Sequence, residues 1–195
     1  MSYQYEIFLS YRRSPTVGLW VKNHLHPKLQ ARIDEISPIP IRISLDTDMQ
    51  SGSAWPDELK LRLRSSAILL TVWSADYFRS DWCMAEWRSF RQREAVLGFS
   101  TPQNPKGLVY PVRYADGDHF HNDAKTTLCK FDFSELNYPE EEFRHTQKYL
   151  EFDDRVQKLA GDLLPLILAA PDWQQDFPIV EPGPMAPVHM PRTVI

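Results

Sequence analysis

Residues 67–74 read Ala-Ile-Leu-Leu-Thr-Val-Trp-Ser, a strongly apolar run that predicts a β-strand. Such a continuous apolar strand is typical of the centre of a parallel sheet, where helices cover both faces. The segments on either side also alternate between strand-like and helix-like patterns. The other predicted strands are residues 5–11, 41–45, 108–114 and 130–133.

Helical periodicity separates these strands. Apolar residues recur every four positions between Val17 and Ile33, with Pro27 inside the pattern, where it should kink or split the helix. A polar loop, 46–55, precedes a short helix that begins near Pro56. Ser80 or Asp81 should cap a helix that runs to about residue 97. The last helix carries one apolar face, formed by Phe152, Val156, Leu159, Leu163 and Leu166 or Ile167.

Strands that alternate with helices predict the α/β class. Five strands in residues 1–170 suit a flavodoxin-like, doubly wound parallel sheet with helices on both faces better than a barrel, which needs roughly 250 residues. Residues 171–195 hold six prolines, so we expect a proline-rich tail or linker that is extended or disordered. A passive terminus is the simpler interpretation of this tail. Docking of a sensor domain or another partner through it stays open.

Composition excludes several functions. The net charge is −4, whereas nucleic-acid binding needs a basic surface, so we expect no nucleic-acid partner. No run of 18 apolar residues occurs, so we expect no segment that spans a membrane, and we expect no membrane partner. The first residues lack the basic and apolar regions of a signal peptide, and the two cysteines, Cys83 and Cys129, fit a reducing compartment. We therefore expect a cytoplasmic protein.

A ligand site is expected where the sheet order reverses. In a 2-1-3-4-5 sheet, the crevice lies outside the carboxyl ends of the first and third strands. These ends and the helix that follows the third strand offer a carboxylate, an indole, hydroxyls and guanidiniums, which suit a ligand with phosphates and flat rings. The side chains that we expect there are Ser10, Tyr11, Arg12, Arg13, Ser74, Trp82, Cys83 and Glu86.

Each candidate also has a structural interpretation. Glu86 could be a helix-surface carboxylate paired with Arg88 or Arg93. Trp82 could belong to the core, and Arg12 and Arg13 could form ion pairs. Cys83 suits a buried position better than a nucleophile, because no histidine is placed by sequence to activate it. Trp55 could simply anchor its loop.

No metal site is expected. Residues 116–123 contain aspartates and histidines, but their spacing matches neither a calcium loop nor a zinc motif. His24 and His26 are two apart, whereas helical zinc pairs are four apart. The chain also lacks a G-x-G-x-x-G fingerprint and a P-loop.

Several segments resemble the Toll/interleukin-1 receptor (TIR) domain family. Phe8-Leu-Ser-Tyr11 is similar to its first sequence box, and Ser80-x-Trp-Cys-x-x-Glu86 to the segment that carries the glutamate of bacterial NAD-cleaving members. Residues 46–56 occupy the place of the BB loop, and Asp132-Phe-Ser-Glu135 is similar to bacterial members. The resemblance covers roughly residues 3–170. The BB-loop pattern of the animal receptors is missing, so their adaptor contacts are not carried over.

This resemblance implies an NAD+ nucleosidase, with NAD+ as a substrate and no cofactor. Glu86 would be the catalytic carboxylate, and the products would be nicotinamide and either ADP-ribose or a cyclic isomer. The resemblance also implies self-association through TIR–TIR contacts, with loop 46–55 of one copy completing a neighbour's site, and a role in signalling, innate immunity or antiphage defence. The candidate substrate contacts are Ser10, Tyr11, Arg12, Trp55, Ser74 and Trp82.

Two other functions compete with this one. A non-enzymatic TIR adaptor would act through homotypic contacts and would not need Glu86. An unrelated receiver-like module would need an acidic pair after the first strand and an aspartate after the third. Those positions hold Ser10-Tyr11 and Trp73-Ser74.

Overall fold

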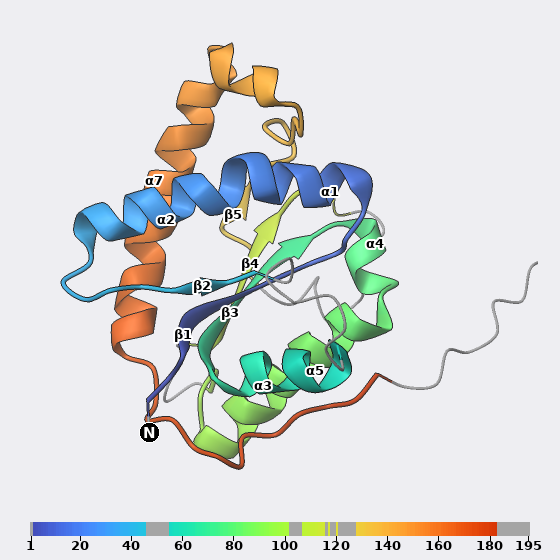
Figure 1. The fold of residues 1–195 in the computed structure, drawn as a ribbon, viewed down its shortest axis with the longest axis vertical. Coiled ribbons are helices and arrows are strands. Elements are labelled where there is room, and N and C mark those ends of the chain that lie inside the picture. Colours follow the sequence, from blue (N-terminus) through green and yellow to red (C-terminus); the bar gives the residue numbers. More distant parts are fainter. Residues whose placement is uncertain are drawn as a thin grey trace, which may run out of the picture.

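A computed structural model shows five parallel strands in one sheet, as the sequence predicts (Figure 1). The structure describes residues 2–45, 55–101, 107–115, 117, 120 and 128–182, with only the backbone of residues 55 and 56. The strand order is β2-β1-β3-β4-β5. The strands are β1 (Tyr5–Tyr11), β2 (Ile43–Ser44), β3 (Ser66–Trp73), β4 (Val109–Arg113) and β5 (Phe131–Asp132).

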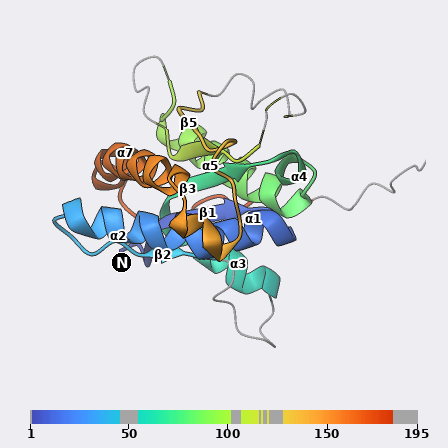
Figure 2. The ribbon, with the colours of Figure 1, turned by 90° about the horizontal axis from the view of Figure 1, so that it is seen from above.

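Helices cover both faces of this sheet (Figure 2). Crossover connections between parallel strands are right-handed. The connection that runs outward from β1 to β2 must therefore lie on one face of the sheet, and the connections that run in the opposite direction, towards β5, must lie on the other face. α7 packs beside α2, on the face of the first connection. The helical elements are α1 (Pro15–Trp20), η1 (Val21–Leu25), α2 (His26–Ile36), α3 (Trp55–Arg64), α4 (Ala75–Phe78), α5 (Asp81–Leu97), η3 (Glu141–His145) and α7 (Lys148–Leu168).

Pro27 interrupts the α-helical hydrogen bonding of the first helix, which is divided into α1, η1 and α2. The proline has no N–H to donate and its ring crowds the carbonyl four residues earlier. The preceding turn, η1, therefore widens to a π-helix, in which the backbone N–H of His26 bonds to the carbonyl of Val21. The chain continues as α2 without a break in direction.

The proline in β4 lies where the sheet needs no donor. In a parallel strand the backbone groups of alternate residues face opposite neighbours. The N–H of Tyr114 bonds to Trp73 of β3, whereas the carbonyl of Arg113 accepts from Phe133 on the β5 side. Pro111 therefore faces the β5 side, where pairing begins only at Val112. The missing N–H of Pro111 therefore leaves no gap in the hydrogen bonding between β3 and β4.

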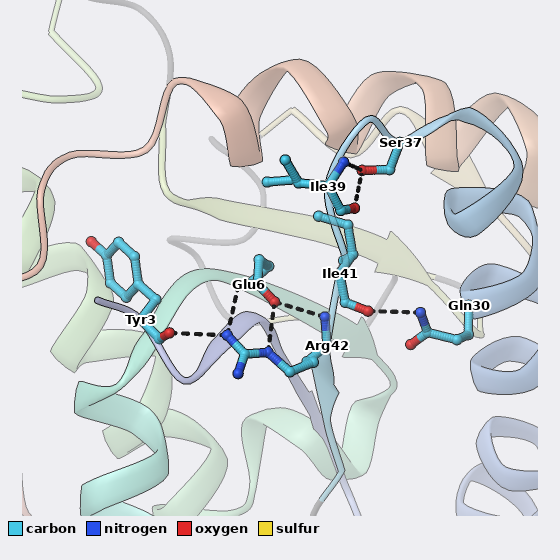
Figure 3. A network of polar contacts seen from close by, with 7 residues as sticks. All are labelled: Tyr3, Glu6, Gln30, Ser37, Ile39, Ile41 and Arg42. Atoms are coloured by element: carbon cyan, nitrogen blue, oxygen red, sulfur yellow. Dashed lines mark hydrogen bonds and ion pairs between the residues drawn. The ribbon is translucent and has the colours of Figure 1, made fainter. Parts of the chain in front are cut away.

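Side chains hold the short edge strand β2 at the amino end of the sheet (Figure 3). The Glu6 carboxylate accepts the backbone N–H of Arg42 at 2.7 Å and pairs with its guanidinium. Arg42 also donates to the carbonyl of Tyr3, and the Gln30 amide donates to the carbonyl of Ile41. These bonds fix the chain that enters β2, at the end of the sheet opposite the predicted site.

Residues 171–182 have no regular secondary structure, yet they pack against the domain. Phe177 is buried and stacks on Tyr3, whose hydroxyl donates to the carbonyl of Pro171. The N–H of Val180 donates to the Ser89 hydroxyl of α5. This described part of the expected tail therefore forms a strap along α5. None of the described helices is long and apolar enough to cross a membrane.

Candidate functional site

Glu86 lies in the second turn of α5, at the end of the sheet where the neighbouring strands β1 and β3 have their carboxyl ends. Ser80 caps this helix, and its hydroxyl accepts the N–H of Cys83 at 3.3 Å, as the capping pattern predicts. The cap sets where α5 begins and therefore which residues of its first turns face the sheet. Glu86 is only 7% exposed, which excludes an ordinary solvated helix-surface position.

Two buried hydroxyls form a hydrogen-bonded series that ends at the Glu86 carboxylate. Oγ of Ser10 is 2.5 Å from Oε2 of Glu86 and donates to it. The same Oγ is 3.0 Å from the phenol oxygen of Tyr77, which also donates to the carbonyl of Cys83 at 3.2 Å. All of these bonds are buried. They join the end of β1, the short helix α4 and the start of α5 around one carboxylate.

The phenol of Tyr77 stays protonated at any physiological pH. Complete burial raises its pKa well above the usual value, and the nearby Cys83 and Glu86 raise it further, while the hydrogen bond with Ser10 opposes the shift. Sequence reasoning missed this residue. Its partner Ser10 is 67 positions away, and no local pattern connects them.

A small cavity opens at this carboxylate. It has a volume of about 70 Å³ and joins the end of β1 to the first turns of α5. Its lining brings together residues of these two elements that the sequence places in one crevice. The lining residues are Tyr11, Arg12, Arg13, Ser80, Trp82, Cys83 and Glu86.

Arg12 brings a positive charge to the rim of the cavity beside the first turn of α5, which also carries the acidic Asp81. Arg12 is exposed, and its Nη1 donates to the Ser80 hydroxyl at 3.4 Å, directly beside the first turn of the helix. The N–H groups of that turn carry the positive end of the helix dipole. A guanidinium and a helix N-terminus at one rim favour an anionic group, such as a phosphate.

Other candidates have different positions. Ser10 is 1% exposed, and its hydroxyl donates a hydrogen bond to the Glu86 carboxylate. Ser74 caps α4 by accepting the N–H of Tyr77. Trp82 lines the cavity and also packs against the core, so its position is compatible with either interpretation. α3 begins at Trp55, but the side chain of Trp55 lies outside the described residues.

The suggested partners of Glu86 on its own helix lie elsewhere. Arg93 is fully buried and donates to the carbonyls of Ser66 and Leu63, at the amino end of β3. Arg88 is exposed, whereas Glu86 is buried. The burial of Glu86 therefore makes its interpretation as a helix-surface carboxylate wrong.

A wider hollow of about 530 Å³ lies at the far edge of the sheet, between β5 and α7. Two of its cationic side chains already have partners: Lys130 pairs with Asp162, and Arg155 donates to the carbonyl of Asp132. No buried carboxylate faces it, because Asp162 and Asp132 are both substantially exposed. We therefore place the candidate site at the smaller cavity, where a buried carboxylate and a helix N-terminus meet.

Metal ligands do not gather in the part of the chain that the structure describes. No group of three histidine, cysteine, aspartate or glutamate side chains there could hold an ion. Most of the acidic loop 116–123 lies outside the described residues. His24 is buried against aromatic rings, and its Nε2 bonds to the carbonyl of Glu140.

The chain belongs to the TIR domain family, whose sequence model matches residues 7–148. Two solved structures are similar to it. The TIR domain of the Toll-related receptor TRR-2 from Hydra magnipapillata is 16% identical, with 78% of this chain and 98% of that chain covered and a TM-score of 0.48. The TIR domains of the activated Roq1 resistosome are 20% identical, with coverage of 85% and 96% and a TM-score of 0.39. No curated protein matches the chain.

Proposed function

We propose that this TIR domain cleaves NAD+ at the bond between nicotinamide and ribose, as bacterial NAD-cleaving TIR domains do, with Glu86 as its catalytic residue. One observation carries the proposal. The Glu86 carboxylate is buried at the edge of a cavity, at the carboxyl end of a parallel sheet, and accepts a 2.5 Å hydrogen bond from Ser10. A carboxylate that served only stability would not need to line a cavity.

The chemistry needs a single carboxylate. The bond from C1′ of the ribose to the nicotinamide nitrogen breaks, and its electron pair neutralises the positive pyridinium nitrogen. Nicotinamide therefore leaves as a neutral molecule without an acid to protonate it. Positive charge develops on the ribose, and the Glu86 carboxylate stabilises it. Water then forms the new C1′–O bond and releases a proton, or a nucleophile within ADP-ribose closes a cyclic isomer.

The rim of the cavity offers contacts for the rest of the substrate. Tyr11 and Trp82 present rings suited to nicotinamide or ribose, and Arg12 with the start of α5 presents positive charge to the diphosphate. Trp55 and Ser74 remain proposed substrate contacts by resemblance. We also propose a role in defence or signalling, in keeping with the family.

Self-association would enlarge the site. A cavity of about 70 Å³ cannot enclose a dinucleotide, since ligand pockets typically span 300–1,000 Å³. We propose that loop 46–55 of a second copy completes the site through TIR–TIR contacts. Activity per molecule should then rise with protein concentration. A flat profile over a hundred-fold range would contradict this part of the proposal.

The proposal is tested by NAD+ consumption at high protein concentration, with products resolved by chromatography. Wild-type protein should release nicotinamide together with ADP-ribose or its cyclic isomer, and folded Glu86→Ala should release neither. Release by both proteins would remove Glu86 from the mechanism. No release by either protein, even when assembled, would favour a non-enzymatic adaptor.

A further inference from the structure

Three buried polar side chains form a chain that ends at Glu86. Tyr77 is fully buried, Ser10 is 1% exposed and Glu86 is 7% exposed. Their oxygens are separated by 3.0 Å between Tyr77 and Ser10, and by 2.5 Å between Ser10 and Glu86. The three residues lie in α4, β1 and α5, so this hydrogen-bond network connects three separate secondary-structure elements.

The number of protons determines the direction of each bond. An ionised carboxylate only accepts, so the single proton of Ser10 is donated to Glu86. Oγ of Ser10 can then only accept from the phenol of Tyr77, whose single proton is shared between this oxygen at 3.0 Å and the Cys83 carbonyl at 3.2 Å. The order of donation is therefore Tyr77 to Ser10 to Glu86. The bond that reaches the charge is the short one, as expected for a charge-assisted hydrogen bond.

We propose that Ser10 and Tyr77 are positioning residues that hold one oxygen of Glu86 and keep this carboxylate ionised, with Tyr77 acting through Ser10. The inference rests on the proposed function for its catalytic consequence, but the ionisation of Glu86 is measurable without any substrate. Neither hydroxyl lines the cavity. This position suits groups that act on the substrate through Glu86 rather than by touching it.

The network permits clean substitutions. In Ser10→Ala, the Tyr77 phenol keeps the Cys83 carbonyl as an acceptor, so no buried donor is left without a partner. In Tyr77→Phe, Ser10 still donates to Glu86. Ser89→Ala is the matched control, because it removes a fully buried hydroxyl that lies on α5, donates to the carbonyl of Ala85 and accepts the N–H of Val180.

The test is a titration of the Glu86 carboxyl carbon by ¹³C NMR, assigned by its loss in Glu86→Gln. Loss of one hydrogen bond to a charged group should raise the midpoint in Ser10→Ala by about one to two pH units. Tyr77→Phe should raise it by less, and the double variant should match Ser10→Ala, because Tyr77 acts only through Ser10. The Ser89→Ala midpoint should equal that of the wild type.

The outcomes separate this inference from the proposed function. If wild-type protein cleaves NAD+, the acid limb of its rate profile should shift upward in parallel with the NMR midpoint. If the wild-type protein does not cleave NAD+, the proposed function fails, but the titration still tests whether Tyr77 and Ser10 act on the ionisation of Glu86. Midpoints in Ser10→Ala and Tyr77→Phe that equal the Ser89→Ala value would overturn the inference. A shift from Tyr77→Phe that persists in the Ser10→Ala background would show that Tyr77 does not act through Ser10.

Discussion

The guanidinium of Arg93 lies over the ring of Phe177, with 4.1 Å between its central carbon and the ring centroid. The ring of Phe90 lies at 4.0 Å from the same carbon, and the guanidinium donates to carbonyls that precede and begin β3. Burial lowers the pKa of Arg93 to about 10. The strap at residues 171–182 therefore closes over a buried charge at the end of α5, the helix that carries Glu86.

Phe177→Ala should lower the free energy of unfolding by about 2–4 kcal/mol, because it removes a buried ring and leaves a cavity over Arg93. Urea unfolding at pH 7 measures the change. Leu168→Ala is the control, since that side chain is 53% exposed and should change stability by less than about 0.5 kcal/mol. Equal effects of the two substitutions would show that the strap adds little to stability.

His24 should make stability depend on pH. Burial lowers its pKa below 6.5, Arg144 lowers it further, and the bond to the Glu140 carbonyl opposes the shift. Below pH 6.5 the unfolded state therefore binds more protons than the folded state, and stability falls as pH falls until the lowered pKa is passed. His24→Gln keeps a donor for the Glu140 carbonyl. The unfolding free energy of the wild type relative to this variant should decrease from pH 7 to pH 5, and a constant difference would contradict the prediction.

Arg32 and Asp153 form an ion pair that joins α2 to α7, and this pair should contribute to stability. Nε and Nη2 of Arg32 donate to the two carboxylate oxygens at 2.8 and 2.6 Å, and this pairing lowers the pKa of Asp153. Its contribution is present above the usual pKa and is lost as pH falls through the lowered one. Asp153→Asn should cost about 1–2 kcal/mol in thermal or urea unfolding at pH 7. Arg32→Lys should lose part of this amount, because lysine cannot form the fork. No loss in either variant would show that the pair is fully screened.

Two glycines should respond oppositely to alanine. A Cβ at Gly107 would lie 2.7 Å from Oε1 of Glu94, which accepts the N–H groups of Leu108 and Val109 at the start of β4. Gly107→Ala should therefore destabilise the protein by about 2 kcal/mol. A Cβ at Gly18 in α1 meets nothing within 4 Å, so Gly18→Ala should stabilise by about 1 kcal/mol. Melting temperatures that shift in the same direction would contradict this account.

The fold was predictable because its signals are local. The apolar run of β3 and the Ser80 cap of α5 each depend on a few neighbouring residues. Even the interruption of α-helical hydrogen bonding in the first helix follows from Pro27 alone. The strap was not foreseen, because prolines indicate only an extended chain. The ring of Phe177 finds its partner Arg93 through the tertiary fold.

The site was predictable only in part. The switch point of the sheet order brings the end of β1 to the first turns of α5, so Tyr11 and Glu86 were expected to meet. Tyr77 belongs to a four-residue helix that no periodicity marks. Its hydroxyl reaches Ser10 across the sheet, and the burial of both groups depends on packing that the sequence does not display.

The most direct test of the central claim compares Glu86→Gln with Glu94→Gln. Both glutamates are buried on α5, at 7% and 2% exposure, but only Glu86 lines the cavity, and Glu94 holds the start of β4. The measurement is the rate of nicotinamide release from NAD+ by each folded variant. We predict that Glu86→Gln lowers this rate at least about 100-fold and that Glu94→Gln changes it less than about three-fold. A similar rate in Glu86→Gln and wild-type protein would contradict the assignment of Glu86 as the catalytic carboxylate.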